Sequence, residues 1–350
     1  MGRRTDPLRF GLIGVGRGAR QLLPALTSGA HGRLVAAADL AVETRESVAR
    51  QYGVRTYASP TELLDDPEVE AVWVATPNQL HAEHAIAAME RGKHVIVSKP
   101  MAISLDETRA MTAVARRNGV LLLAGHTQSM APSIRKMAEI VQSGELGRLG
   151  MLHTSHFTDW MYRPRQPAEL DVALGGGPVF RQASHQVDIA RSIAGSPVRS
   201  VRASVVQLDA SRGAPGAYTA YLEFANGVPA TVVYSGYGHF SMDNLLQRSS
   251  AGGSNSLGLF GFTLVTCELG DIRESANGLL VYDRDACREI ELPNEARGAA
   301  ELQELYNAVR HGEALVHDGA WGQATLEVCL AINESARTRS EVHLPDGGPV

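Results

Sequence analysis

Cysteine is scarce in this sequence, and its three occurrences show no pairing pattern. Cys267, Cys287 and Cys329 are odd in number, far apart and outside any Cys-X-X-Cys arrangement. A disulfide framework needs an even set of cysteines, and a thiolate metal site needs closely spaced ones. The sequence argues against both and favours a reducing compartment, so we expect a cytoplasmic protein.

Long apolar runs and blocks of like charge are also missing. No window approaches the run of about 18 apolar residues that a membrane span requires. The first residues, Met1 to Pro7, contain no apolar stretch of signal-peptide length. The net charge is −5 with no basic block, whereas nucleic-acid binding needs concentrated positive charge. We therefore expect neither a membrane nor a nucleic acid as partner.

Short apolar runs alternate with helical patterns over the first third of the chain. The predicted strands are residues 8–15, 34–39, 71–75, 93–97 and 120–124, and the predicted helices are residues 19–26, 42–51, 79–91 and 105–118. Capping boxes start at Ser59 and Ser104, each followed three residues later by glutamate. This alternation predicts an α/β domain, with a parallel sheet covered by helices on both faces.

The pattern changes after residue 126. A helix over 132–142 leads into longer strands at 148–158, 198–208, 217–225, 228–234 and 262–268, with further helices at 184–193, 299–310 and 320–336. The run Phe224-Ala225-Asn226-Gly227 predicts a hairpin. We expect a second, α+β domain over 127–350 with an open, mostly antiparallel sheet, and a flexible loop at the Gly/Ser-rich stretch 249–258.

A glycine-rich loop follows the first predicted strand directly. In Gly14-Val15-Gly16-Arg17-Gly18-Ala19, glycines permit a tight turn and close approach of a pyrophosphate, and the next helix supplies amide donors. Asp39 ends the second strand, where an acidic side chain accepts hydrogen bonds from ribose hydroxyls. Because this carboxylate repels a 2′-phosphate, the loop predicts NAD rather than NADP, in a Rossmann domain over 1–126. Arg17 weakens this preference for NAD, since its guanidinium could reach a 2′-phosphate.

Two further strand ends carry residues suited to a cofactor site. Thr76, Pro77 and Asn78 follow the third strand at the carboxyl edge of the sheet, and His81 lies at the start of the next helix. The next strand ends on Ser98-Lys99-Pro100, where proline restricts the backbone of Lys99. An ammonium held near a nicotinamide indicates redox chemistry on a hydroxyl or carbonyl group. We expect cofactor contacts from Thr76, Pro77, Asn78, His81, Ser98 and Lys99.

These residues together resemble the glucose–fructose oxidoreductase/inositol dehydrogenase/MocA (Gfo/Idh/MocA) family. The resemblance rests on the nucleotide loop, Val74-Ala75-Thr76-Pro77-Asn78, His81, Gly92-Lys93-His94-Val95 and Lys99-Pro100, and continues with Gly175-Gly176-Gly177, His185 and Asp188. It implies an NAD(P)-dependent oxidoreductase whose second domain, 127–350, binds a small-molecule substrate and forms homo-oligomers, dimers or tetramers. Two positions depart from the family. Ser98 stands before Lys99 where the family usually has glutamate, and Arg181 stands four residues before His185 where the family often has aspartate.

The resemblance assigns the catalytic step to Lys99 and His185. Oxidation of a secondary alcohol removes the hydroxyl proton as hydride leaves the carbon, and an imidazole, which ordinarily titrates near neutral pH, suits the proton step. A lysine ammonium beside the same oxygen stabilises the developing alkoxide. Asp188, one turn after His185, either fixes the imidazole tautomer or only caps or solvates the helix.

Arginines and aromatic residues in the second domain indicate an acidic substrate. A guanidinium at Arg181 favours an anion over a neutral polyol. We expect Arg181 to bind a flat, carboxylated ring together with Trp160, Tyr162, Arg163 and Arg165. These segments also resemble the family branch of 4,5-dihydroxyphthalate (phthalate cis-dihydrodiol) dehydrogenases, which implies oxidation of a cis-dihydrodiol to a product that aromatises.

Other interpretations stay open. A sugar or inositol-like polyol dehydrogenase uses the same chemistry, and a non-catalytic NAD-binding sensor would account for Ser98 and Arg181. A lyase or glycosidase that retains its NAD is a third. A metal site is not expected, because the spacing of His153 and His156 points them to opposite faces of a predicted strand.

Overall fold

Two compact units make up the chain in the computed structural model, which describes residues 5–240, 242 and 260–345, without the side chain of Arg17. The first unit is Met1–Thr127 with Ala296–Gln323, and the second is Gln128–Glu295 with Ala324–Val350. The first break falls one residue from the predicted boundary. The assignment of 296–323 to the second domain is wrong. The predicted loop at 249–258 lies outside the described residues.

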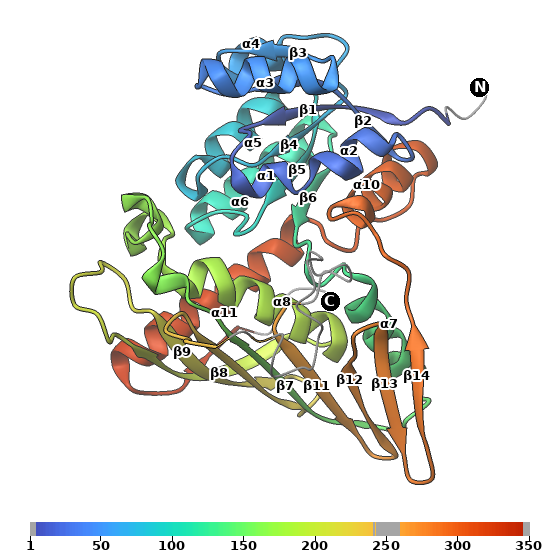
Figure 1. Ribbon diagram of the computed structural model, residues 1–350, viewed down its shortest axis with the longest axis vertical. Helices are drawn as coiled ribbons and strands as arrows, with labels where there is room; N and C mark the ends of the chain where they lie inside the picture. Colours follow the sequence, from blue (N-terminus) through green and yellow to red (C-terminus); the bar gives the residue numbers. More distant parts are fainter. Residues whose placement is uncertain (1–4, 241, 243–259, 346–350) are drawn as a thin grey trace. The chain divides into compact units, whose positions relative to one another are not determined.

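The first unit is built on a parallel sheet with the strand order β3-β2-β1-β4-β5-β6 (Figure 1). Its strands are β1 (Leu8–Ile13), β2 (Gly32–Ala38), β3 (Arg55–Tyr57), β4 (Ala71–Val74), β5 (His94–Ser98) and β6 (Leu122–Gly125). Apolar runs predict all of them except β3, a strand of three residues with none fully buried. The order reverses between β1 and β4, and such a switch point is where parallel sheets bind ligands.

The helices of this unit agree with the expected periodicity apart from one break. They are α1 (Arg17–Arg20), α2 (Leu23–Ser28), α3 (Val42–Tyr52), α4 (Pro60–Leu64), α5 (His81–Glu90), α6 (Leu105–Asn118) and α10 (Ala299–His311). The single helix predicted over 19–26 is two, because Pro24 lies in the first turn of α2. Proline lacks an N–H and is tolerated there but not inside a helix.

Both predicted helix caps are confirmed. Ser59 Oγ accepts from the Glu62 N–H at 3.3 Å at the start of α4, and Ser104 Oγ accepts from the Glu107 N–H at 3.2 Å at the start of α6. These bonds satisfy amides that have no partner within their own helix. The start of each helix is thus specified locally.

Helix α10 joins the first unit because its apolar face completes that core. Leu302, Leu305 and Tyr306 of α10 pack in the same cluster as Leu8 and Phe10 of β1. A helix far along the sequence is recruited by this contact, which local patterns cannot report. This is the physical reason for the domain correction.

The second unit contains a long mixed sheet with the order β14-β13-β12-β11-β7-β10-β9-β8-β15. Its strands are β7 (Leu149–Phe157), β8 (Val198–Val206), β9 (Ala217–Phe224), β10 (Pro229–Ser235), β11 (Phe262–Cys267), β12 (Gly270–Glu274), β13 (Gly278–Asp283), β14 (Cys287–Glu291) and β15 (Val342–His343). The hairpin between β9 and β10 is confirmed, with Gly227 at φ +81°. The expectation of a mostly antiparallel sheet holds except for β7 and β10, which pair in parallel.

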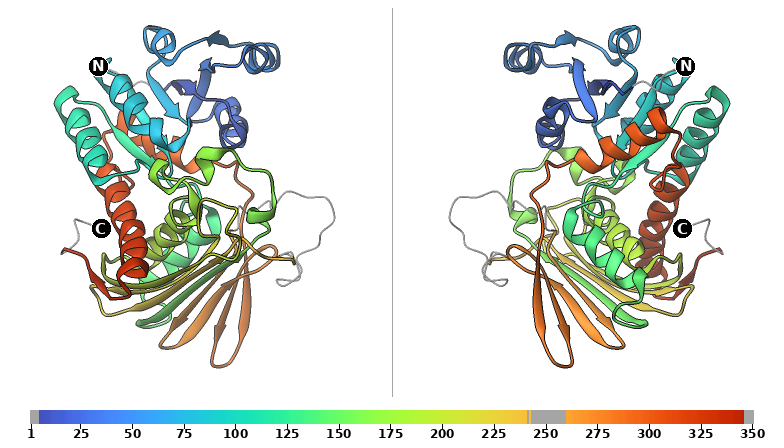
Figure 2. Two further views of the ribbon diagram at one scale, coloured as in Figure 1. Left: turned by 90° about the vertical axis from the view of Figure 1, so that its left-hand side faces the viewer. Right: turned by 90° about the vertical axis from the view of Figure 1, so that its right-hand side faces the viewer.

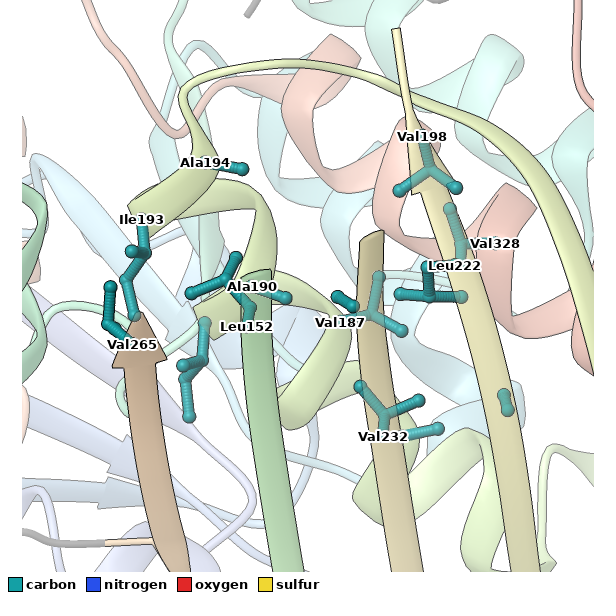
Figure 3. Packing of buried hydrophobic residues seen from close by; sticks show 14 of the residues in the cluster. Leu152, Val187, Ala190, Ile193, Ala194, Val198, Leu222, Val232, Val265 and Val328 are labelled. Carbon is teal, nitrogen blue, oxygen red and sulfur yellow. The ribbon is translucent and has the colours of Figure 1, made fainter. Parts of the chain in front are cut away.

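One face of this sheet is covered by helices (Figure 2). They are α7 (Pro132–Ser143), α8 (Ser184–Ala194) and α11 (Gly319–Thr338), the last of which begins in the first unit and ends in the second. Figure 3 shows Val187, Ala190 and Ile193 of α8 against side chains of the strands, including Leu152, Leu222, Val232 and Val265. This apolar layer fixes the position of α8, which carries His185.

The opposite face of the sheet carries no described helix (Figure 2). Along each strand, side chains on this face alternate with those of the core. Tyr221 of β9 lies opposite Thr231 of β10, and Thr231 lies opposite His153 of β7. Apolar residues on this face stay exposed, with Met151 48% and Tyr221 42% accessible. None of the helices in the described ranges has the length and hydropathy to cross a membrane.

Candidate active site

The glycine loop after β1 lies at the switch point of the parallel sheet. Gly14 has φ +84°, and a Cβ there would lie 2.9 Å from Thr76 Cγ2, so a side chain is excluded on both grounds. At Gly16 and Gly18 nothing described lies within 4 Å of a Cβ position. The backbone is therefore open on that side, as close approach of a pyrophosphate requires.

Asp39 is tied to this loop by its carboxylate. Its Oδ2 accepts from the Val15 N–H at 2.8 Å, and its Oδ1 accepts from the Ala41 N–H at 2.9 Å. The carboxylate therefore lies beside the loop, as an acidic ribose-binding residue must. Ala19 is buried, as close packing of the helix against the sheet requires. The side chain of Arg17 lies outside the described residues.

His81 supports the loop after β4 from beneath. Its Nε2 lies 2.8 Å from the Thr76 carbonyl oxygen, and its Nδ1 lies 2.8 Å from the Pro100 carbonyl oxygen. The ring is fully buried, which lowers its pKa to about 4. With both nitrogens directed at backbone carbonyls, His81 joins the ends of β4 and β5 instead of presenting a polar atom to a cofactor. The neighbouring His84 contacts Thr76 Oγ1 through Nδ1 at 3.1 Å.

Lys99 follows β5 directly and is half-buried. On one side Ser98 Oγ accepts from Trp73 Nε1 at 3.1 Å, and on the other His81 lies against the Pro100 carbonyl. The positive charge of Lys99 contributes, after burial, to the low pKa of His81. The residue is thus held at the carboxyl edge of the sheet, on the strand next to β4 and its Thr76-Pro77-Asn78 loop.

His185 lies in the second unit, at the start of α8. The preceding turn, Val179–Ala183, is a π-helix that runs into α8 and carries Arg181. π-Helical turns are rare and occur frequently at functional sites. The described bond of Asp188 is to Thr325, whose hydroxyl donates to Oδ1 at 3.1 Å and accepts from Arg191 at 2.6 Å. Asp188 therefore belongs to a buried network that anchors α8 to α11.

An aromatic row extends from His185 along the second unit. The ring of Phe260 lies 4.6 Å from His185 and 4.3 Å from His156, and His156 lies 5.9 Å from Tyr234. The Tyr234 hydroxyl reaches Thr158 Oγ1 at 2.7 Å. Sequence reasoning did not place these residues at the site: it missed Phe260, considered His156 only as a metal ligand, and missed Tyr234. The last two are partners in the parallel pairing of β7 and β10, which local patterns do not specify.

The predicted substrate arginines differ in their ion-pair partners. Arg165 Nη1 and Arg181 Nη2 both reach Glu169 Oε1, at 3.4 and 3.1 Å, and the Arg165 guanidinium lies 4.5 Å from the centre of the buried Trp160 ring. Arg163 is exposed and pairs with Asp159 at 2.6 Å rather than with Glu169. All three arginines nevertheless lie close enough to Tyr234 to interact electrostatically with its hydroxyl.

The described contacts of Tyr162 are with His239 and Tyr237. Its ring stacks on His239, and its hydroxyl lies 3.0 Å from His239 Nε2. Glu169, which neither charge nor spacing singled out, connects the two arginines. Its position three residues after Gln166, at the start of a short turn, was the available signal.

Metal-ligating side chains do not cluster in the described ranges: no group of three or more His, Cys, Asp or Glu could hold an ion there. His153 Nδ1 contacts Thr231 Oγ1 at 2.7 Å, whereas His156 packs on Phe260. The arrangement provides a dinucleotide loop with a lysine in one unit and an imidazole near guanidiniums in the other.

Comparison with known proteins identifies the family. Residues 8–126 match the oxidoreductase family with an NAD-binding Rossmann fold, and residues 134–247 match the GFO/IDH/MocA C-terminal domain. The chain is 32% identical over 378 residues to 1-carboxy-3-chloro-3,4-dihydroxycyclohexa-1,5-diene dehydrogenase of Comamonas testosteroni, covering 94% of this chain and 95% of that protein.

A more distant curated relative and a solved structure are also similar to this chain over nearly its whole length. Identity is 27% over 343 residues to scyllo-inositol 2-dehydrogenase (NAD(+)) of Bacillus subtilis, with 96% of each chain covered. A solved structure from Bordetella bronchiseptica RB50 matches with a TM-score of 0.89 at 34% identity, covering 97% of this chain and 100% of that one.

The chain belongs to the Gfo/Idh/MocA family of oxidoreductases. Its first unit contains an NAD-binding Rossmann domain, and the protein is an NAD(P)-dependent oxidoreductase of that family. The predicted family, fold class, enzyme class and cofactor are confirmed. The individual site residues stay predictions.

Proposed function

We propose that this protein is an NAD-dependent dehydrogenase that oxidises a ring hydroxyl of a carboxylated cyclic substrate, a cis-dihydrodiol foremost. The observation that carries the proposal is the pair Arg165 and Arg181, joined by Glu169 in the same unit as His185. Paired guanidiniums favour a carboxylate. The dehydrogenase from Comamonas testosteroni, by its name, acts on a carboxylated dihydroxycyclohexadiene.

Two residues supply the polar chemistry in this proposal. The NAD nicotinamide, when bound, accepts hydride from the carbon that bears the hydroxyl. His185 takes the hydroxyl proton on a ring nitrogen, and the Lys99 ammonium stabilises the oxygen as negative charge develops on it. A cis-dihydrodiol oxidised at one carbon gives a hydroxydienone, which tautomerises to a catechol. Aromatisation draws that reaction forward.

Cofactor binding in this proposal uses the loop and the two strand ends already described. Gly14, Gly16 and Gly18 accommodate the pyrophosphate, with Ala19 packing beneath them, and Asp39 accepts from the ribose. Thr76, Pro77 and Asn78 line the nicotinamide side together with Ser98 and Lys99. The geometry gives His81 a positioning role. The structure describes no side chain for Arg17, which stays a sequence-based candidate.

Assay of the purified protein with NAD+ tests the reaction. A cis-dihydrodiol of a benzene carboxylic acid should reduce NAD+ with a higher kcat/KM than inositols or aldoses. In Lys99→Met and in His185→Asn, kcat should fall about 100-fold or more with NADH affinity retained. Lys93→Met is the matched lysine control, since Lys93 Nζ donates to the carbonyls of Asp66 and Val69.

Different outcomes of that assay identify the alternatives. Preference for inositols would overturn the carboxylated substrate and favour a polyol dehydrogenase. Tight NAD binding without turnover of any diol would favour a sensor. Cofactor that stays bound through turnover of another substrate without net reduction would favour a lyase or glycosidase.

We also propose a homo-oligomer and a cytoplasmic location. The sheet face with Met151 and Tyr221 exposes apolar side chains among polar ones, and exposed apolar side chains occur at interfaces between copies of a chain. The three cysteines are free thiols, which a reducing compartment preserves.

A further inference from the structure

Glu169 is the shared partner of two arginines that come from different segments of the second unit. Its Oε1 lies 3.4 Å from Arg165 Nη1 and 3.1 Å from Arg181 Nη2, with side-chain exposures of 22%, 7% and 31% for Glu169, Arg165 and Arg181. One carboxylate therefore faces two guanidiniums in a partly dehydrated setting. Within this cluster, defined as Arg165, Glu169 and Arg181, positive charge exceeds negative charge by one.

Two of the three members of the cluster, Arg165 and Glu169, are held in place by further contacts. Arg165 Nε donates to the Trp160 carbonyl at 3.1 Å, and its guanidinium lies over the Trp160 ring. Glu169 Oε2 accepts from the Gln166 N–H at 3.0 Å in a capping box. Because these bonds use groups outside the ion pairs, Arg165 and Glu169 are fixed before any ligand arrives.

The cluster belongs to the neighbourhood of His185. Arg181 is four residues before His185 in one continuous helical segment, Val179–Ala183 followed by α8. On the other side, Thr158 Oγ1 bonds both the Tyr234 hydroxyl and, at 3.3 Å, the Trp160 N–H. Trp160 beneath Arg165 thus connects to the aromatic row that ends at His185. The arginine cluster and His185 therefore belong to one connected set of side chains in the second unit.

We propose that Glu169 makes the protein select a substrate ring that carries a single carboxylate. This inference rests on the proposed function and deepens it. Two guanidiniums with one resident carboxylate attract one further carboxylate, so a ring with one carboxylate is preferred to a neutral ring. A second, adjacent carboxylate on the ring meets the charge of Glu169, and like charges brought together in a partly buried site repel strongly. Glu169 is a specificity residue for a monocarboxylated ring.

Calorimetric binding tests the proposal without depending on turnover. The probes are catechol, 3,4-dihydroxybenzoate and 4,5-dihydroxyphthalate, which carry none, one and two carboxylates, titrated into the protein with saturating NAD+. The wild type should bind 3,4-dihydroxybenzoate about tenfold more tightly than either of the others. In Glu169→Gln, which keeps a capping side chain at this position, affinity for 4,5-dihydroxyphthalate should rise about tenfold. In Arg181→Gln the preference for 3,4-dihydroxybenzoate over catechol should be lost.

The matched control is Asp159→Asn. It removes the same unit of negative charge from the neighbouring, exposed Asp159–Arg163 pair, so the ranking of the three probes should stay that of the wild type. Equal affinities for the three probes, or an equal gain for the dicarboxylate in Asp159→Asn and Glu169→Gln, would overturn the role of Glu169.

The same measurements separate this inference from the proposed function. The expected ranking and its change in Glu169→Gln, without oxidation of any diol, would support the charge selection and reject the dehydrogenase substrate. Reduction of NAD+ by diols, with equal affinities for the three probes, would support the dehydrogenase function and reject the charge selection by Glu169. Thermal unfolding of each variant identifies any loss of fold, and Glu169→Asp, which retains the charge, should keep the dicarboxylate excluded.

Discussion

At the scale of single residues, His81 combines two opposing demands. Two backbone carbonyls, of Thr76 and Pro100, lie 2.8 Å from its two ring nitrogens. An imidazolium could donate to both, but burial disfavours the charged ring and lowers its pKa to about 4. At neutral pH the ring is uncharged and has one N–H, so it donates to one carbonyl at a time. The residue is buried in the position that supports Lys99.

Replacement of His81 should separate positioning from bulk stability. His81→Ala leaves two carbonyls without this partner, so the free energy of unfolding should fall by about 2–4 kcal/mol. The kcat should fall about tenfold while the KM for NAD+ changes little, since the Lys99 segment loses its support. Urea unfolding and steady-state kinetics measure the two effects.

His84→Ala is the control for that experiment, because its described hydrogen bond is to a threonine hydroxyl. His84→Ala should lower the free energy of unfolding by about 1 kcal/mol or less and leave kcat unchanged. His81→Gln, which keeps an N–H donor, should restore part of the kcat. If kcat in His81→Ala stays at the wild-type value despite lower stability, the positioning role is wrong.

The proposed role of Asp39 is to select NAD over NADP. Asp39→Ser removes the carboxylate that accepts from the Val15 N–H and that we propose to bind the ribose. NADH affinity should fall about tenfold, whereas NADPH affinity should rise, because the charge that repels a 2′-phosphate is gone. Fluorescence titration with both cofactors measures the ratio. Glu43→Ser, in the first turn of α3, is the control and should leave the ratio of NADH to NADPH affinity unchanged. A wild-type ratio in Asp39→Ser would contradict the role proposed for Asp39.

At the scale of elements, α10 carries a buried glutamate, Glu301, and a partly buried one, Glu304, whose pKa values shift in opposite directions. Burial raises the pKa of Glu301 to about 7, and among the described residues its Oε1 has no hydrogen-bond partner. The charges of Arg297 and His317 lower this pKa and that of Glu304 raises it, all by less than burial does. Burial also raises the pKa of Glu304, but the hydrogen bond from His317 and further bonds outweigh it, so the net shift is downward.

The pH dependence of stability should follow from Glu301. Its folded pKa lies above its unfolded value of 4.5, so the unfolded state loses its proton first as pH rises. The stabilisation is therefore full below 4.5 and is lost as pH rises through about 7. Relative to the wild type, Glu301→Gln should gain stability between these values, on the order of 2–3 kcal/mol in total.

Thermal unfolding over this pH range measures the gain, with Glu304→Gln as the contrasting variant. Because His317 Nδ1 and two backbone amides contact the Glu304 carboxylate, Glu304→Gln should destabilise the protein at pH 7. A Glu301→Gln curve parallel to the wild type at all pH values would show that Glu301 does not titrate in this range.

At the scale of the whole molecule, the sheet of the second unit has one face in a core and one face exposed. The core face packs on α7, α8 and α11, whereas Met151 and Tyr221 on the other face remain accessible. An extended sheet with apolar side chains in water is a liability unless another surface covers it. A second copy of the chain is the partner that we propose.

Charged substitutions on that face should change the assembly. Met151→Lys together with Tyr221→Lys should reduce the molar mass measured by light scattering after gel filtration, because buried ammonium groups oppose association. Val316→Lys, an exposed apolar residue in the first unit, should leave the mass unchanged. A monomeric wild type would reject the oligomer.

Much of the cofactor site could be predicted from sequence because its residues follow strand ends in the chain. Gly14, Asp39, Thr76 and Lys99 each come directly after an apolar run, and parallel strands bring their carboxyl ends to one edge. The caps at Ser59 and Ser104 are local for the same reason. The substrate side could be predicted only in part, since Glu169 was not expected to join Arg165 and Arg181.

The sequence by itself determined the alternation of strands and helices, the dinucleotide loop and the family, because these depend on short-range periodicity and fixed spacing. Tertiary structure decided that α10 joins the first unit, that β7 and β10 pair in parallel, and that Glu169 connects two arginines. Each of these is a contact between segments apart in the chain. Such contacts depend on strand order, register and complementary packing, which no local pattern encodes.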